Sequence, residues 1–312
     1  MNKFTSIEIC AGAGGQALGL EQAGFNHLAL VEIEPIACHT LRLNRPNWKV
    51  LHENVKDFSA KEFKGVDLFA GGVPCPPFSI AGKQMGADDE RDLFPEALRL
   101  VNECIPKAIM LENVRGLLDK KFIDYRLSII TELHSLGYQC DWQIVNASDY
   151  GVSQLRPRAI LIALKKEFFP FFKWPEKEIS PKSIGELLYE EMNALGWESI
   201  EAWKIIANTV APTIVGGSKK HGGADLGPTR AKQAWAKLGV DGSGLADKPP
   251  INGFSAMPKL TLQMAALVQG FPKEWQFAGK KTPAYRQVGN AFPPPVAKAI
   301  GQSLIKALNK NG

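Results

Sequence analysis

The sequence predicts an α/β fold, a doubly wound sheet with a second, smaller domain, and three observations predict it. The first half of the chain alternates strand-like and helix-like segments, the pattern of a parallel sheet with crossover helices. A glycine-rich turn at 11–15 joins the first strand-like segment to the first helical one. After residue 165 this alternation is lost, as expected of a separate domain or a long functional insertion.

The expected elements follow from hydrophobic periodicity, taken in order. Short apolar runs predict strands at 6–10, 26–32, 66–70, 108–112, 138–146 and 158–164. Helical spacing is found at 16–23, 35–43, 93–104, 123–136, 260–270 and 296–308. Between the last strand and the last two helices the sequence is first rich in aromatic residues and proline, and then in glycine. We therefore expect a first domain at 1–165, a second at 166–258, and a segment at 259–312 that returns to the first.

Length and composition allow a water-soluble enzyme of one large domain and a smaller one. It has 312 residues, 45% of them apolar and 22% charged, which is ordinary for a globular protein. The longest apolar runs are far shorter than the ~20 residues of a membrane span, and the N-terminus leads directly into a strand rather than a signal peptide. We expect a cytoplasmic protein without membrane contact.

Cysteine content and charge exclude further classes. The five cysteines are scattered and form no C-x-x-C pair, so neither a disulfide framework nor a zinc site is indicated, and we expect no metal. The net charge of +5 is compatible with a polyanionic partner but is too small to argue for one.

Cys75 stands within Pro74-Cys75-Pro76-Pro77, directly after the apolar run that ends at Val73. Prolines are incompatible with a helix here, so the thiol is expected on a loop at the carboxyl end of a strand, where open α/β sheets carry out chemistry. A thiol in that position is a candidate nucleophile. The alternative on this segment alone is a buried core cysteine.

The turn Ala11-Gly12-Ala13-Gly14-Gly15 lets a ligand approach backbone N–H groups at a helix N-terminus. Glu32 ends the second expected strand, where a carboxylate can accept hydrogen bonds from ribose hydroxyls. Together they indicate a nucleoside-containing cofactor. Taken singly, the first could be only a tight turn and the second a solvated loop residue.

Two further segments supply ionisable groups. Glu112 ends the fourth expected strand and should emerge at the same sheet edge as Cys75, where a half-buried carboxyl group can serve as an acid. Arg156 and Arg158 alternate on an extended segment and so share one face. In isolation, Glu112 could be a helix cap or an ion-pair partner, and the arginines could simply be solvated.

In combination, these segments resemble the DNA (cytosine-5) methyltransferases over nearly the whole chain. The motifs that carry the resemblance occur in family order: Ala11 to Gly15, Pro74-Cys75 with Phe78-Ser79, Glu112-Asn113-Val114, Gln154-x-Arg156-x-Arg158, Leu260-Thr261 with Gln269-Gly270-Phe271-Pro272, and Gln287-x-Gly289-Asn290. The resemblance implies a Rossmann-like S-adenosylmethionine-dependent methyltransferase sheet, with a target-recognition domain at 166–258. It also implies a reaction in which a cysteine thiolate adds to carbon 6 of a cytosine flipped out of the duplex.

The resemblance further assigns roles to residues. Cys75, Glu112, Arg156 and Arg158 take the catalytic positions, with the two arginines orienting Glu112 and the flipped base. The implied cofactor-binding residues are Cys10, Ala11, Gly12, Gly14, Gly15, Glu32, Ile33, Asn54, Val55, Pro74, Asn290 and Ala291. The implied nucleic-acid-binding residues are Ser79, Gln84, Lys219, Lys220 and Arg230. Cys10, Ile33 and Asn54 depart from common family choices at the adenine pocket.

The partners follow from the same resemblance: S-adenosylmethionine as cofactor, double-stranded DNA as substrate, and a cognate restriction endonuclease as functional partner of a monomeric enzyme. A tRNA cytosine-5 methyltransferase shares most of the motifs and is the first alternative. A non-catalytic nucleic-acid-binding module is the second, although such a module has no use for Cys75, Glu112 and both arginines together. An amino-methylating enzyme would carry a different proline loop.

Overall fold

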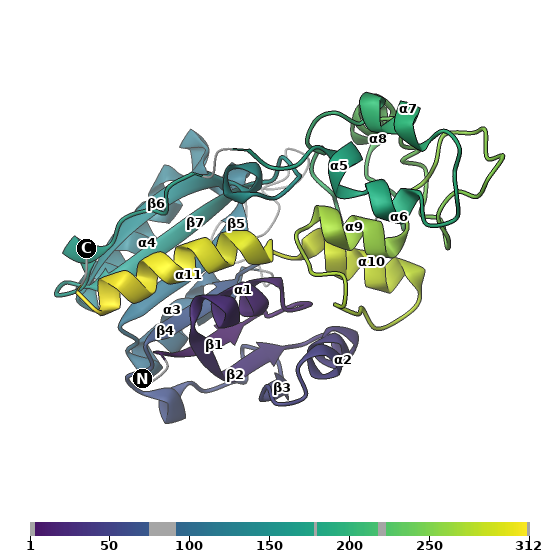
Figure 1. Cartoon of the computed structure of the whole chain (residues 1–312). Helices are drawn as coiled ribbons and strands as arrows, with labels where there is room; N and C mark the ends of the chain where they lie inside the picture. Colours follow the sequence, from purple (N-terminus) through teal and green to yellow (C-terminus); the bar gives the residue numbers. More distant parts are fainter. Residues whose placement is uncertain (1–3, 75–91, 178–179, 218–222, 311–312) are drawn as a thin grey trace.

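A seven-stranded sheet forms the larger lobe, and a cluster of helices beside it forms the smaller one (Figure 1). The computed structural model describes residues 4–74, 92–177, 180–217 and 223–310. The strands are β1 Phe4–Ile9, β2 Phe25–Glu32, β3 Val50–His52, β4 Leu68–Gly72, β5 Ala108–Val114, β6 Tyr138–Asn146 and β7 Pro157–Lys165. Their order in the sheet is β3-β2-β1-β4-β5-β7-β6.

Strand direction explains where chemistry can take place. Strands β3, β2, β1, β4 and β5 run parallel, whereas β7 is antiparallel to both of its neighbours, β5 and β6. The order changes direction at β1, so the segments that follow β1 and β4 leave the same edge toward opposite sides. A doubly wound sheet binds its ligands at such a switch point.

The longer helices of the larger lobe cover both faces of the sheet. They are α1 Gly15–Ala23, α2 Pro35–Asn44, α3 Phe94–Cys104, α4 Ile123–Ser135 and α11 Pro294–Leu308. The side chains of β4 show how the two faces are filled, because successive residues of a strand point to opposite sides. Phe69 packs with α3 and α4, whereas Leu68 and Ala70 pack with the buried face of α11. Figure 1 shows α11 lying along the sheet beside α1.

The smaller lobe has its own hydrophobic cluster. Its helices are α5 Ile184–Leu187, α6 Tyr189–Met192, α7 Ile200–Ile206, α8 Thr229–Ala236, α9 Leu262–Val268 and α10 Lys281–Asn290. The cluster includes Trp203 of α7, Trp235 of α8 and Met264 of α9. Within the expected segment 259–312, α9 and α10 thus join the smaller lobe, and α11 lies on the sheet (Figure 1).

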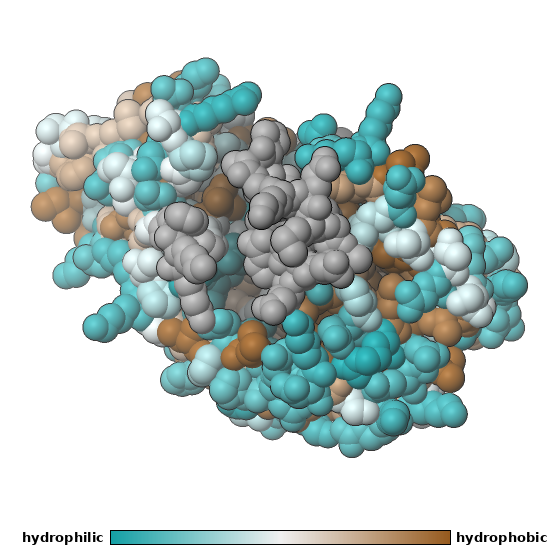
Figure 2. Space-filling model, turned by 180° about the vertical axis from the view of Figure 1, so that it is seen from behind, coloured by the Kyte–Doolittle hydropathy of each residue, from teal (hydrophilic) through white to brown (hydrophobic). Residues whose placement is uncertain are grey.

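Five short 3-10 helices complete the elements of the described residues. They are η1 Lys61–Phe63, η2 Arg115–Leu118, η3 Lys120–Phe122, η4 Ala147–Tyr150 and η5 Phe169–Phe171. On the face opposite that of Figure 1, the described surface is mostly hydrophilic and its apolar residues lie in separate patches (Figure 2). In the described part of the chain, no helix has both the length and the apolar content needed to cross a bilayer.

Four points of the sequence-based expectation need correction. The sheet is mixed rather than parallel. The short η4 connection joins β6 directly to β7, so β7 runs antiparallel to β6. The strand expected at 66–70 lies at 68–72, and the one expected at 6–10 ends at Ile9. Strand β3 was not expected, because three residues are too few to show a periodicity.

Candidate active site

The Pro74 end of the β4 loop is fixed to strand β5. Val73 N–H donates to the Glu112 carbonyl at 3.2 Å, and the Asn113 side chain donates to the Val73 carbonyl at 2.8 Å. Leu93 N–H donates to the Pro74 carbonyl at 3.2 Å, so the chain returns to the same point before α3. Cys75, Ser79 and Gln84 lie outside the described residues. Cys75 follows this fixed stem directly in the chain.

Glu112 and Arg158 form a partly buried ion pair at this sheet edge. Arg158 Nε lies 2.7 Å from Glu112 Oε1, and each side chain is 14% exposed. The pairing register explains the contact: Arg158 is opposite Val114, so Glu112 is its diagonal neighbour on the same face. A Cβ on Gly72 would lie 3.3 Å from Glu112 Oε2, so glycine leaves room for the carboxylate. The predicted meeting of these two charges is present.

Arg156 points elsewhere, into the junction of the lobes. Its guanidinium is fully buried and donates to the carbonyls of Ile214 at 2.8 Å and Gly289 at 2.7 Å. Burial lowers the pKa of this group, and the nearby positive charge of Arg158 lowers it further. Arg156 therefore does not share the face of Arg158 and donates to the junction rather than to Glu112, although the charges of Arg156 and Glu112 still interact. That the two arginines together orient Glu112 and the base stays a prediction. The segment is not a regular strand before Pro157, so side chains need not alternate there.

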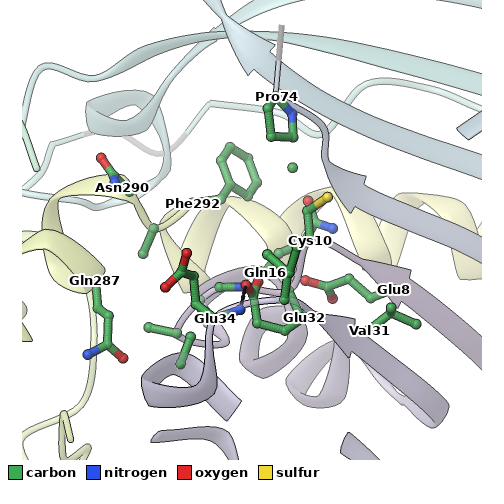
Figure 3. Close-up of a pocket in the computed structure, with 18 of the residues that line it drawn as sticks. Glu8, Cys10, Gln16, Val31, Glu32, Glu34, Pro74, Gln287, Asn290 and Phe292 are labelled. Carbon is green, nitrogen blue, oxygen red and sulfur yellow. Dashed lines mark hydrogen bonds between the residues drawn. The ribbon is translucent and has the colours of Figure 1, made fainter. Parts of the chain in front are cut away.

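A pocket of about 500 Å³ opens beside the ion pair, at the carboxyl edge of β1, β2 and β4 (Figure 3). Its lining includes all but one of the predicted cofactor residues: Cys10, Ala11, Gly12, Gly15, Glu32, Ile33, Asn54, Val55, Pro74, Asn290 and Ala291. Glu112 lines it as well, so the pocket is continuous with the ion pair. The glycine turn and Glu32, which indicate a nucleoside-containing ligand, therefore lie in the same site as Glu112, the candidate acid.

Glu32 organises the glycine turn. Its carboxylate accepts from Gly12 N–H at 2.7 Å through one oxygen and from Glu34 N–H at 2.8 Å through the other. Burial raises the pKa of Glu32, and the two backbone N–H groups act against that rise. Each oxygen keeps a lone pair that can accept a ribose hydroxyl.

Gly14 is not among the described residues that line the pocket. It precedes α1 with φ +84°, and a Cβ there would lie 2.6 Å from Leu41 Cδ2, on the side of α2. Its role in this structure is to shape the turn. Gly15 does line the pocket, and a Cβ on it would lie 2.2 Å from the Phe292 carbonyl oxygen. Glycine at this position thus lets the returning segment close against α1.

Comparison with known proteins decides the family. Residues 4–306 match the profile of the C-5 cytosine-specific DNA methylases. The chain is 56% identical to the type II methyltransferase M.NgoMIV of Neisseria gonorrhoeae over 312 residues, which is 99% of each chain. It is 55% identical to the type II methyltransferase M.NaeI of Lentzea aerocolonigenes, covering all of this chain and 77% of that one. The chain belongs to the C-5 cytosine-specific DNA methylases.

A solved structure supports the fold of this family member. A prophage-encoded Escherichia coli protein, described as a DNA modification methyltransferase, aligns with a TM-score of 0.70 at 25% identity. The alignment covers 98% of this chain and 99% of that one. The predicted Rossmann-like methyltransferase sheet and the predicted activity, cytosine-5 methylation of DNA, are therefore confirmed at the level of the family. Enzymes of this family use S-adenosylmethionine.

The pocket fits that cofactor on its own chemistry, through residues that sequence reasoning missed. Glu8 of β1 and Gln16 of α1 line it, are buried, and have side-chain atoms without a hydrogen-bond partner among the described residues: Glu8 Oε2, Gln16 Oε1 and Gln16 Nε2. Burial raises the pKa of Glu8 well above its usual range, the neighbouring Gln16 side chain acts against this rise, and the negative charge of Glu32 adds to it. A neutral Glu8 carboxyl group and the Gln16 amide can each donate and accept hydrogen bonds, so this part of the lining favours a ligand with both N–H groups and oxygen acceptors. Glu8 precedes the glycine turn by three residues, which was a usable signal.

The structure shows the surroundings of Cys10, Ile33 and Asn54, the three residues that depart from common family choices at the adenine pocket. Cys10 has φ +52°, and burial raises the pKa of its thiol, with Glu32 and Glu8 adding to the rise, so the group stays neutral and inert. Ile33 is 54% exposed at the pocket rim, and Asn54 accepts from Lys56 N–H through its side-chain oxygen. At Ile33, the rim of the pocket therefore carries an aliphatic side chain where an aromatic ring is common in the family.

The predicted nucleic-acid residues divide into two groups. Lys219 and Lys220 lie outside the described residues. Arg230 lies in the first turn of α8, is exposed, and makes no hydrogen bond or ion pair with the described part of the chain. Arg230 is thus free to meet a polyanion, and the structure places it in the smaller lobe.

Proposed function

We propose that this enzyme methylates carbon 5 of cytosine at a specific site in double-stranded DNA, as the methyltransferase of a type II restriction-modification system. The observation that carries the proposal is the Glu112–Arg158 pair on the wall of a pocket that also holds Glu32 and the glycine turn. The high identity to two type II methyltransferases over the whole chain supports the biological setting. It favours DNA over tRNA as the substrate. A cognate endonuclease is then the expected functional partner, and we expect a monomer in the cytoplasm.

In the proposed reaction the Cys75 thiolate adds to carbon 6 of the flipped cytosine, and the electron pair of the 5,6 double bond moves to carbon 5. S-adenosylmethionine supplies the methyl group that carbon 5 takes up. A base then removes the carbon 5 proton, the double bond re-forms and the thiolate leaves. Glu112 favours the addition by holding the N3 position, where protonation draws electron density into the ring.

Arg158 supports this step through its contact with Glu112. The 2.7 Å contact fixes the carboxylate at the sheet edge. Arg158 Nη1 donates to the Pro157 carbonyl at 2.9 Å, which leaves the N–H groups of Nη2 for the base oxygen. Arg156 takes a different part in our proposal, as a positioning residue. By holding the carbonyls of Ile214 and Gly289, it sets the smaller lobe against the sheet.

The cofactor is held, in this proposal, by the predicted residues that line the pocket, with Glu8 and Gln16 in addition. Glu32 takes the ribose hydroxyls, and Ile33 and Val55 provide apolar contact to the adenine. Arg230, Lys219, Lys220, Ser79 and Gln84 remain proposed contacts to DNA.

A duplex with 5-fluorocytosine at the target tests the mechanism. Fluorine cannot leave carbon 5 as a proton does, so the enzyme should remain attached to this DNA through Cys75 when the cofactor is present. Mass spectrometry of the digested complex identifies the residue, and Cys75→Ser, offered the same duplex, is the control. The proposal fails if active enzyme gives no adduct or if the adduct maps to another residue. Preferential methylation of tRNA over duplex DNA would overturn the substrate assignment.

A further inference from the structure

Helix α10 presents one face to the pocket. Pro283, Arg286, Gln287 and Asn290 all line it, at the spacing of three and four residues that places side chains on one side of a helix. The helix is fixed there, because the Gln287 amide donates to the Ala278 carbonyl at 2.9 Å. The sequence motifs include Gln287 and Asn290, but neither Pro283 nor Arg286.

Arg286 differs in charge from the other ionisable residues of the described pocket lining. Five glutamates line the pocket, and Arg286 is the one cation among the described lining residues. The glutamates are Glu8, Glu32, Glu34, Glu53 and Glu112. A pocket with many acids and a single cation suits a ligand that carries both a cationic and an anionic group, because each ligand charge then has an opposite partner.

Arg286 is also unpaired. Its Nε is buried, and its guanidinium makes no hydrogen bond or ion pair with any described residue. Other described arginines are each bonded to a carboxylate or a carbonyl: Arg42, Arg45, Arg99, Arg126, Arg156 and Arg158. Arg115 and Arg230 are unpaired too, but they are exposed and away from the pocket lining. A buried donor without a partner is unfavourable, and a bound acceptor removes that cost.

We propose that Arg286 binds the carboxylate at the amino-acid end of S-adenosylmethionine. The planar guanidinium matches a carboxylate in two-point geometry, and the glutamates of the same lining supply partners for the ammonium and sulfonium end of the ligand. A DNA phosphate is the other anion in the reaction, but it belongs to a bulky duplex, whereas Arg286 Nε is shielded within the pocket wall. The inference rests on the proposed cofactor role of this pocket.

Calorimetry with two ligands tests the contact. The ligands are S-adenosylmethionine and its decarboxylated form, which keeps the sulfonium and the ammonium but lacks the carboxylate. The native enzyme should bind the decarboxylated form about 10- to 100-fold more weakly, as expected for loss of a charge-assisted pair. Arg286→Met should lose a similar factor for S-adenosylmethionine and no longer prefer it, since the remaining acids favour the more cationic ligand. Arg286→Lys should fall between the two.

Arg115→Met is the matched control, because it removes an unpaired, exposed arginine outside the pocket and should keep the native preference. The proposal is overturned if the native enzyme does not distinguish the ligands, which requires no variant. It is also overturned if Arg286→Met keeps the preference while binding of duplex DNA weakens, since Arg286 would then be a phosphate contact. If the native enzyme binds neither ligand, the proposed function of the pocket fails as well.

Discussion

Two glycines of α1 offer a direct test of how the returning segment closes the pocket. A Cβ on Gly15 would lie 2.2 Å from the Phe292 carbonyl oxygen, and a Cβ on Gly19 would lie 2.2 Å from the Pro294 carbonyl oxygen. Both distances are more than 1 Å below the 3.4 Å at which ordinary contact begins. Backbone carbonyls cannot rotate away as side chains do, so either α1 or the returning segment must shift.

The two substitutions should both destabilise the fold but differ in binding. Overpacking costs about 1–3 kcal/mol, and alanine recovers at most about 0.5–1 kcal/mol of helix propensity, so both should lower the free energy of unfolding. Gly19→Ala should lower it at least as much as Gly15→Ala, because its Cβ would also lie 2.6 Å from Ala297 Cβ and 2.8 Å from Lys298 N. Gly15 and the adjoining Ala291 and Phe292 line the pocket, whereas Gly19 lies one turn further along α1 and is not in the described lining. Gly15→Ala should therefore also weaken S-adenosylmethionine binding, by about tenfold or more.

Urea denaturation and calorimetry on the same preparations separate the two effects. Gly19→Ala serves as the control for general destabilisation of the α1–α11 contact. The reasoning is refuted if Gly19→Ala weakens cofactor binding as much as Gly15→Ala does. It is refuted equally if Gly15→Ala loses stability but binds the cofactor like the native enzyme.

Three further predictions concern buried charges. Burial raises the pKa of Glu8, so the folded enzyme keeps a proton that the unfolded chain releases, and stability falls as pH rises above the ordinary titration range of a glutamate. In urea titrations, Glu8→Gln should therefore gain in unfolding free energy relative to the native enzyme as pH rises above that range. Arg156→Met should lower the unfolding free energy by roughly 2–6 kcal/mol in the same assay, because two buried carbonyls lose their donor. Arg126→Met is the control: its carbonyl partners are closer to solvent, so it should lower the unfolding free energy by less than about 1 kcal/mol. Glu32→Ala should weaken cofactor binding by about 1–3 kcal/mol in calorimetry, and unchanged affinity would remove Glu32 from the ribose role.

The fold was largely predictable because the sheet is built from local signals. Buried parallel strands appear as short apolar runs, and the glycine turn marks the first crossover, so both could be found in the sequence. The direction of β7 could not be predicted, because it depends on where in the sheet the chain returns after η4, which is between β5 and β6. Helix α10 was also missed, because its apolar residues are few and its buried face is shared with the pocket.

The site was predictable where a motif fixes a residue at the end of a strand. Glu32 and Glu112 follow this rule, and both line the pocket. The division of labour between Arg156 and Arg158 does not follow from the sequence, because it depends on carbonyls 58 and 133 residues away from Arg156. Arg286 gave no signal of its own, because only the folded pocket shows a lone cation among acids.

The central claim is that this enzyme places a methyl group on carbon 5 of cytosine at one DNA site. Expression in a host that lacks cytosine methylation, followed by sequencing that distinguishes 5-methylcytosine, tests it most directly, with Glu112→Gln as the paired control. The account predicts 5-methylcytosine in a single sequence context in the genomic DNA of cells that carry the native enzyme, and a strong reduction with the variant. Unmethylated genomic DNA from cells that contain folded enzyme, or methylation on the amino group of cytosine or adenine, would contradict it.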